Sequence, residues 1–242
     1  MRGLLGFVLM GCLLPAWAHA TPRDAVPGWP RAEVLDLALR AWRCGVSAGA
    51  FDASLLTIID YTLPSSERRL WVIDTVARRV LFHELVAHGV GSGEIFAHAF
   101  SNRPGSRQSS LGLFRTEDVY RGEHGLGLRL TGLEPGVNDR AMERAIVVHG
   151  APYVSAAVVA ARGQLGRSWG CPALERGVDR RVIARIAGGT ALFAYYPDAR
   201  WLRTSPFLHC DATDAEVARR TDAGAGLTGS PGADTVADGS YR

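Results

Sequence analysis

The chain contains no lysine, because all 27 of its basic residues are arginine. This absence excludes chemistry that depends on a lysine side chain: a Ser-x-x-Lys acylase, a Schiff-base enzyme or a nucleotide-binding loop with a phosphate-binding lysine. The formal net charge is only +3, and the arginines are scattered among acidic residues rather than gathered in one stretch. The sequence therefore predicts no nucleic-acid partner.

Long apolar runs are also scarce. The main one, residues 3–14, is shorter than the roughly 20 residues that a membrane helix needs, and it precedes Ala18-His19-Ala20. Such a run followed by small residues is typical of a secretory signal peptide. We therefore expect residues 1–20 to be a signal peptide, the mature protein to be periplasmic or otherwise exported, and no membrane span. Lipid anchoring through Cys12 stays an alternative.

Cysteine is rare, with four residues in the whole chain. Without the signal peptide, three remain: Cys44, Cys171 and Cys210. An odd number in an oxidising compartment indicates one free thiol. Cys44 and Cys210 could pair and leave Cys171 available, or Cys44 could be a small buried hydrophobic residue. The chain has no Cys-x-x-Cys motif, which disfavours a thiol redox protein.

Hydrophobic patterning predicts a mainly β fold with flanking helices, arranged as a twisted β-sandwich or partly open barrel. Apolar residues at helical spacing predict helices over residues 31–43, over residues 154–162 with Gly163 as the stop, and along residues 178–186. Short β-branched and aromatic runs between turn residues predict strands at residues 56–61, 70–76, 80–87, 95–100, 110–115, 126–130, 145–149 and 190–196.

About 220 mature residues with 47% hydrophobic content suit one catalytic domain with short extensions. We expect an N-terminal extension with an amphipathic helix at residues 21–54 and the catalytic domain at residues 55–210. Residues 211–242 lack large apolar side chains. They are predicted to be disordered because they cannot bury enough surface to offset the entropy of ordering.

Cys171 is the candidate nucleophile, within the sequence Ser-Trp-Gly-Cys-Pro of residues 168–172. A helix is predicted soon after it, and a nearby helix N-terminus would favour the thiolate. Pro172 has no N–H, so a backbone donor to an oxyanion must come from Cys171 or from Gly170 and its neighbours. Gly170 would also let a substrate carbonyl approach closely.

His149 is the candidate base, because it ends the apolar run of residues 145–148 and is followed by Gly150. Catalytic groups often lie at strand ends, where the sheet holds them and the tip stays accessible. His83 and His88 are five residues apart, so they would not share a face on a helix or on a strand. No metal site and no organic cofactor are predicted.

Around these residues the chain resembles the L,D-transpeptidase family of bacterial cell-wall enzymes, which has a YkuD-type catalytic domain. His149-Gly150 followed by residues 168–171 is similar to the family's His-Gly and Ser-His-Gly-Cys signature. Residues 166–173 match a branch with the core Gly-Arg-Ser-Trp-Gly-Cys-Pro-Ala. Further segments similar to that branch are residues 100–102, 109–112, 124–125 and 132–134, so that the resemblance covers residues 55–197.

The resemblance implies a β-rich fold and acyl transfer on peptidoglycan stem peptides, without metal or cofactor. Cys171 would attack the carbonyl on the L-centre side of an L,D peptide bond, with His149 assisting proton transfer. D-alanine would leave, and an amine or water would resolve the thioester. Ser168 would hold the loop or the imidazole, and backbone amides around Gly170 and Cys171 would bind the oxyanion.

Trp169 departs from the family's more widespread motif, which has histidine there. It is expected either to pack against the loop or to line the substrate groove. Gly150, Arg167 and His124 are further substrate-binding candidates; Arg167 could pair with a stem-peptide carboxylate, although exposed surface roles remain open for it and for His124.

Two alternatives to transpeptidation remain, an L,D-carboxypeptidase that uses water as the acceptor and a non-catalytic cell-wall binding module. A papain-like protease is disfavoured because its Cys-Gly-Ser-Cys-Trp type of signature is absent. The sequence does not predict the oligomeric state, nor does it separate crosslinking from trimming or protein attachment.

Overall fold

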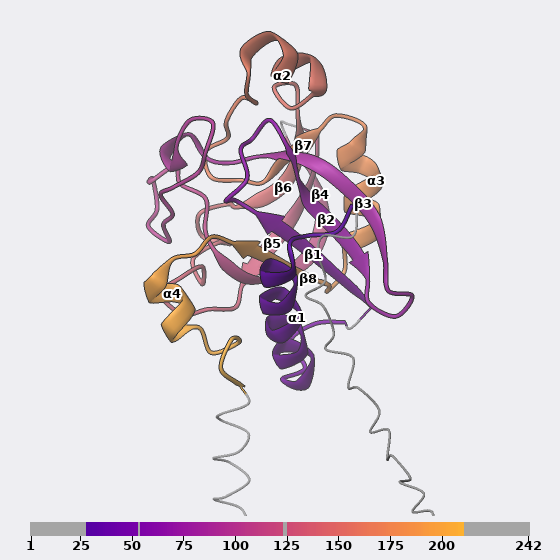
Figure 1. Cartoon of the computed structure of the whole chain (residues 1–242), viewed down its shortest axis with the longest axis vertical. Coiled ribbons are helices and arrows are strands. Elements are labelled where there is room, and N and C mark those ends of the chain that lie inside the picture. The colour runs from indigo at the N-terminus through magenta and orange to yellow at the C-terminus, as the bar shows by residue number, and fades with distance from the viewer. Residues whose placement is uncertain (1–27, 53, 123–124, 211–242) are drawn as a thin grey trace, which may run out of the picture.

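A computed structural model of the chain describes residues 28–52, 54–122 and 125–210 (Figure 1). Within these residues, eight strands form a barrel and four α-helices surround it. The helices are α1 (Ala32–Ser47), α2 (Ala156–Arg162), α3 (Val178–Ile186) and α4 (Ala199–Thr204). The strands are β1 (Leu55–Asp60), β2 (Arg68–Asp74), β3 (Arg79–Ala87), β4 (Gly112–Gly122), β5 (Gly125–Gly132), β6 (Val147–Ala151), β7 (Ala173–Glu175) and β8 (Ala191–Tyr195).

The strands close in the order β1-β2-β3-β7-β6-β5-β4-β8. Two neighbouring pairs are parallel, β1 with β8 and β6 with β7, and the other pairs are antiparallel. Closure pairs every strand on both sides, which removes exposed sheet edges. The predicted mainly β fold with flanking helices is confirmed, and the barrel is closed rather than partly open.

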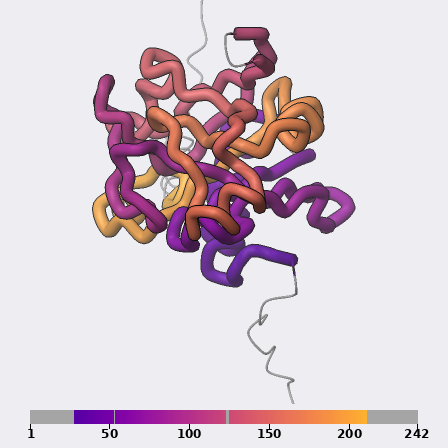
Figure 2. The backbone as a smooth tube through the Cα atoms, turned by 90° about the horizontal axis from the view of Figure 1, so that it is seen from above, coloured from indigo at the N-terminus to yellow at the C-terminus, as the bar shows by residue number. Residues whose placement is uncertain are grey.

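The short strand β7 joins two halves of the barrel. It pairs antiparallel with β3 and parallel with β6, although β3 ends more than eighty residues earlier in the chain. Figure 1 shows β7 in the upper part of the barrel, and Figure 2 shows purple and orange parts of the tube, far apart in the sequence, side by side. The residues that precede β7 are thereby held against both strands.

The predicted helices form, with small shifts of their ends. Helix α1 crosses the lower front of the barrel in Figure 1 and buries Val34, Ala38 and Ala41 against β1 and β8. Helix α3 buries Val182 and Ile183 on the side of β5, β6 and β7. The apolar stripes read from the sequence therefore face the barrel.

Helix α2 is set by its caps rather than by packing. The Ser155 hydroxyl accepts the Val158 N–H at 3.2 Å, and Gly163 ends the helix with φ of 71°. Gly163 was the predicted stop, and a left-handed residue there favours glycine. None of the side chains of α2 is buried, and the helix projects at the top of Figure 1.

The observed local structure differs from the predicted one in three respects. Residues 95–100 form no strand, because Ala97 makes only an isolated bridge to Gly93 in a loop folded back on itself. Strand β4 begins at Gly112 rather than at residue 110 and runs on to Gly122. Strand β7 and helix α4 were not predicted.

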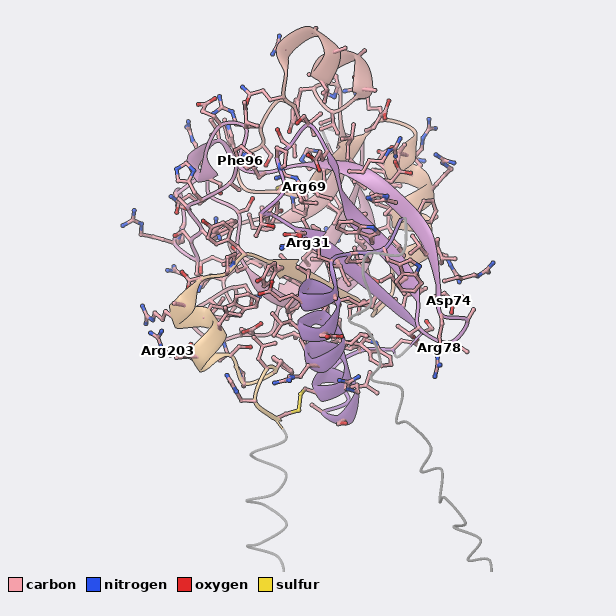
Figure 3. All side chains as sticks on the ribbon, viewed as in Figure 1. Arg31, Arg69, Asp74, Arg78, Phe96 and Arg203 are labelled. Carbon is pink, nitrogen blue, oxygen red and sulfur yellow. A yellow bond between two sulfur atoms is a disulfide. The ribbon has the colours of Figure 1, made fainter. Side chains whose placement is uncertain are left out.

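Cys44 and Cys210 form a disulfide that joins α1 to the segment after α4, the yellow bond in the lower part of Figure 3. Their sequence separation is 166 residues, so the bridge ties together the two ends of the described fold. Cys171 is the free cysteine of the described residues. The pairing that was left open in the sequence thus forms, and Cys44 is also buried.

Several predictions fall outside the described residues. They concern the signal peptide at residues 1–20, Cys12, His124 and the tail at residues 211–242. Among the helices of the described part, none is long and apolar enough to cross a membrane.

Candidate active site

The loop that carries Cys171 is fastened to the end of β3. The Ser168 N–H donates to the His88 carbonyl at 2.9 Å, and the Val90 N–H donates to the Ser168 carbonyl at 2.7 Å. Gly89 and Ser168 form a parallel bridge between these two bonds. The start of the loop thus continues the barrel's hydrogen bonding before β7 begins.

Ser168 closes the turn in front of Cys171. Its buried hydroxyl donates to the Cys171 carbonyl at 2.6 Å and accepts the Gly170 N–H at 3.1 Å. Of the two roles considered for Ser168, these contacts describe the one that holds the loop. They also engage the Gly170 amide, one of the candidate oxyanion donors.

Gly170 lies where two backbone segments meet. Its φ is 125°, and a β-carbon added there would lie 2.7 Å from the Gln108 carbonyl oxygen. The Ser109 hydroxyl donates to the Gly170 carbonyl and accepts the Gly89 N–H, both at 3.0 Å. Only glycine suits this backbone and this close approach.

The Cys171 sulfur is half-buried and lies 3.6 Å from the Ala145 carbonyl, toward which the thiol points. Burial raises the pKa of the Cys171 thiol, while the Val147 amide, the Arg144 guanidinium and the Cys171 amide act to lower it. Because burial is the largest of these effects, the neutral thiol is favoured.

The prediction that a helix N-terminus activates Cys171 is wrong. Strand β7 follows Pro172, and α3 begins only at Val178 after a turn at Gly177. The polar groups around the sulfur are therefore amides of the β6 and β7 region and the Arg144 guanidinium, rather than a helix end.

His149 lies in the middle of β6, not at the end of a strand as predicted. It stands opposite Ala173 of β7 and Gly127 of β5. Its Nδ1 lies 3.1 Å from the Gly150 carbonyl. A carbonyl only accepts, so this bond places the proton on Nδ1 and leaves Nε2 as the acceptor nitrogen of the neutral ring.

One pocket of about 710 Å³ brings most of the predicted site together. Its lining includes five of the predicted residues: Cys171, His149, Ser168, Trp169 and Arg167.

Trp169 is 73% exposed and carries the Arg107 guanidinium 4.8 Å from its ring centre. It therefore lines the groove with its indole largely open to solvent. Arg167 also borders the pocket, but its guanidinium forms an ion pair with Glu94. Gly150 lines a neighbouring pocket instead.

Arg144 is a site residue that sequence reasoning missed. Its half-buried guanidinium donates to the Ser101 and Gln108 carbonyls and to the Ser110 and Ser106 hydroxyls. It thereby holds the loop before β4 next to the pocket that contains Cys171. No motif marks this arginine, whose position depends on the folded loop.

Tyr120 and Tyr153 line the same pocket, and burial raises the pKa of Tyr153 to about 12.

A buried polar cluster lies behind the nucleophile loop, with Arg69 in the interior of Figure 3. The Arg69 guanidinium donates to the Val86 and Leu63 carbonyls and to His88 Nδ1 at 2.8 Å. Since arginine only donates, Nδ1 of His88 accepts and its Nε2–H donates to the Gly93 carbonyl. Burial and the Arg69 charge lower the pKa of His88 to about 4. Burial lowers the pKa of Arg69 to about 10.

The described residues contain no group of three histidine, cysteine or acidic side chains placed to hold a metal ion. His83 stacks on Trp71 with ring centres 4.7 Å apart, whereas His88 is bound to Arg69. His83 and His88 therefore belong to separate structural contacts.

Comparisons with known proteins give one family. The family model described as the L,D-transpeptidase catalytic domain matches residues 30–195, which include α1 as well as the barrel. No curated protein matches the chain.

Solved structures similar to this chain include an L,D-transpeptidase from Mycobacterium smegmatis, with 14% identity over 59% of each chain and a TM-score of 0.37. Another, from Stackebrandtia nassauensis, has 13% identity over 67% of this chain and 65% of its own, with a TM-score of 0.36. The helical cell shape determining protein Pgp2 from Campylobacter jejuni has 11% identity over 60% of this chain and 48% of its own, with a TM-score of 0.41. The matched part thus spans less than two thirds of each of these proteins.

Because the family model spans more than half of the chain, the protein belongs to the L,D-transpeptidase catalytic-domain family.

Proposed function

We propose that the protein is a peptidoglycan L,D-transpeptidase with Cys171 as the nucleophile and His149 as the proton carrier. The observation that supports this most is that both side chains line one pocket of about 710 Å³. The β6–β7 register places His149 opposite Ala173, two residues after Cys171. A pocket of this size accommodates several residues of a peptide.

In the acylation step, the Cys171 sulfur attacks the carbonyl on the L-centre side of an L,D peptide bond in a stem tetrapeptide. The C–N bond breaks, a thioester forms, and D-alanine leaves. His149 takes the thiol proton at Nε2 and delivers it to the departing amine. The raised pKa of Cys171 makes this base necessary, because the resting sulfur carries its proton.

The developing oxyanion needs a backbone donor near the sulfur. Ser168 already accepts the Gly170 N–H, so we assign this contact to the N–H of Cys171. Ser109 then acts as a positioning residue, since its hydroxyl donates to the Gly170 carbonyl of the peptide unit that carries that N–H. Ser168 holds the next peptide unit of the loop through its bond to the Cys171 carbonyl.

The second step regenerates the thiol. An acceptor amine attacks the thioester carbonyl, its proton passes to His149, and the Cys171 thiolate leaves and is reprotonated. An amine from another stem gives a crosslink, and water in its place gives L,D-carboxypeptidase activity. Family membership favours the amine.

We also propose that the protein acts outside the cytoplasm, where peptidoglycan lies. The Cys44–Cys210 disulfide supports an oxidising compartment. The signal-peptide pattern of residues 1–20 also supports export from the cytoplasm.

The test is to incubate the purified mature protein with disaccharide tetrapeptide and to follow D-alanine release and new crosslinks by mass spectrometry. Wild type is expected to release D-alanine, and Cys171→Ala is expected to lose at least about 1,000-fold in rate. Val76→Ala, at a residue 80% exposed, serves as the handling control. Equal muropeptide profiles for wild type and Cys171→Ala would reject the proposal. Peptide binding without turnover would leave a cell-wall binding module.

A further inference from the structure

A second pocket of about 420 Å³ adjoins the catalytic one. It is lined by Arg121, Gly125, Leu126, Gly150, Arg176, Gly177, Asp179 and Arg180. Gly125 and Leu126, at the start of β5, line both pockets. A ligand in the catalytic groove can therefore extend over this shared lip.

The second pocket carries an excess of positive charge. Three arginines face one acid, Asp179, whose buried carboxylate accepts the Gly177 N–H at 2.7 Å. In the described part of the chain, none of these arginines forms an ion pair with a carboxylate. Arg167 of the catalytic pocket differs, because Glu94 already neutralises it. The guanidinium of Arg144, which also lines the catalytic pocket, is occupied by four carbonyl and hydroxyl acceptors. Among the described residues, the second pocket thus gathers three arginines without an ion pair.

Gly150 forms the wall between β6 and α3. A β-carbon at this glycine would lie 2.2 Å from Asp179 Oδ2, so any larger residue would displace the carboxylate. His149, the preceding residue, lines the catalytic pocket. Successive residues of one strand point to opposite faces, so β6 presents the imidazole to one pocket and Gly150 to the other.

The strand register gives the separation of the pockets. The Val147 amide acts on the Cys171 sulfur, and Gly150 lies three residues further along β6. At about 3.3 Å per residue this is a distance of about 10 Å. A peptide with its reacting bond at Cys171 and a carboxylate in the second pocket must cover at least this distance, because it also passes over the shared lip to the other face of β6.

We propose that Arg121, Arg176 and Arg180 bind a free carboxylate of a peptidoglycan stem peptide, at least about 10 Å from the reacting bond. This rests on the proposed function for the identity of the substrate and adds a recognition site outside the Cys171 pocket. Guanidinium groups bind carboxylates through paired hydrogen bonds. The carboxylate belongs to either the donor or the acceptor stem, and the two sources affect different steps.

The binding test uses Cys171→Ala protein, which prevents turnover, and titration calorimetry with a stem tetrapeptide and its carboxamide form. Arg176→Gln/Arg180→Gln removes two charges from the pocket. Arg181→Gln/Arg185→Gln removes two charges from exposed positions of α3 that do not line it. We expect the pocket variant to weaken tetrapeptide binding roughly five-fold relative to the control variant. The carboxamide should bind both variants equally.

Kinetics on the otherwise wild-type protein separate the two sources. A raised KM for D-alanine release would place the donor carboxylate in the pocket. Unchanged release with weaker transfer to a peptide acceptor would place the acceptor there. In either case kcat for D-alanine release should stay unchanged, because the arginines do not touch the reacting bond.

Equal tetrapeptide affinity in the pocket and control variants would overturn the inference. It would also be overturned if the pocket variant still bound the tetrapeptide more tightly than the carboxamide form. Wild type without D-alanine release, but with arginine-dependent binding, would reject the proposed function and keep the pocket. Far-ultraviolet circular dichroism of each variant establishes that it is folded before these comparisons.

Discussion

His88 makes the stability of the nucleophile loop depend on pH. Its ring is fully buried against Arg69, and its carbonyl accepts the Ser168 N–H. Protonation would put a positive charge in the interior beside a guanidinium. Burial and that charge together lower the pKa of His88 from 6.5 to about 4.

The size of the effect follows from linkage. Between pH 6.5 and 4 the unfolded chain binds a proton at His88 and the folded chain does not. His88 therefore destabilises the fold progressively as pH falls through this range. The shift from 6.5 to about 4 corresponds to about 3 kcal/mol of unfolding free energy.

The assay is urea unfolding of wild type and His88→Asn at pH 7 and at pH 4. The asparagine oxygen can accept the Arg69 N–H in place of Nδ1, and it does not titrate. Wild type is expected to lose about 3 kcal/mol more than the variant over this range. His209→Asn, at an exposed site, is the control and should follow wild type. Parallel losses in wild type and His88→Asn would refute the reasoning.

Three further predictions concern the nucleophile and its supports. Gly170→Ala is expected to lower the unfolding free energy by about 2 kcal/mol, measured in urea, because its φ of 125° disfavours a β-carbon; an unchanged midpoint would contradict this. Arg144→Gln is expected to shift iodoacetamide alkylation of Cys171 to higher pH, because it removes the cation that lowers the pKa of this thiol in the wild type; an unshifted profile would exclude the effect. Cys44→Ala/Cys210→Ala is expected to cost about 5 kcal/mol for a loop of 166 residues; equal stability of the variant and the oxidised wild type would show that the bridge does not contribute.

Local sequence signals were sufficient where one element determines its own structure. The apolar stripe of α3 and the glycine after α2 could both be read from the sequence. Helical spacing and a left-handed stop depend on neighbouring residues alone. The order of the strands around the barrel could not be read in this way, because it depends on contacts between distant segments.

Strand β7 shows where local reasoning fails. It has three residues and exists because β3 and β6 pair with it on both sides. Without it, the next element predicted after Pro172 was the helix along residues 178–186. The expected effect of a helix N-terminus on Cys171 was wrong for that reason.

The part of the candidate site that could be predicted is the part that residue type and local sequence identify. Cysteine count and turn chemistry selected Cys171, whereas His149 depended largely on the family resemblance. Arg144 and the three arginines beside Gly150 could not be selected, because arginine is common on surfaces. Folding of the loop before β4 brings Arg144 to the catalytic pocket, and the end of β4, the turn between β7 and α3 and the start of α3 bring the other three to the second pocket.

The most direct test of the account is to trap the acyl-enzyme. The mature protein is mixed with tetrapeptide, quenched in acid, and examined by intact mass and peptide mapping. The expected result is an added mass equal to the tetrapeptide less D-alanine, located on Cys171 and absent from Cys171→Ala. An adduct on another residue, or D-alanine release that persists in Cys171→Ala, would contradict it.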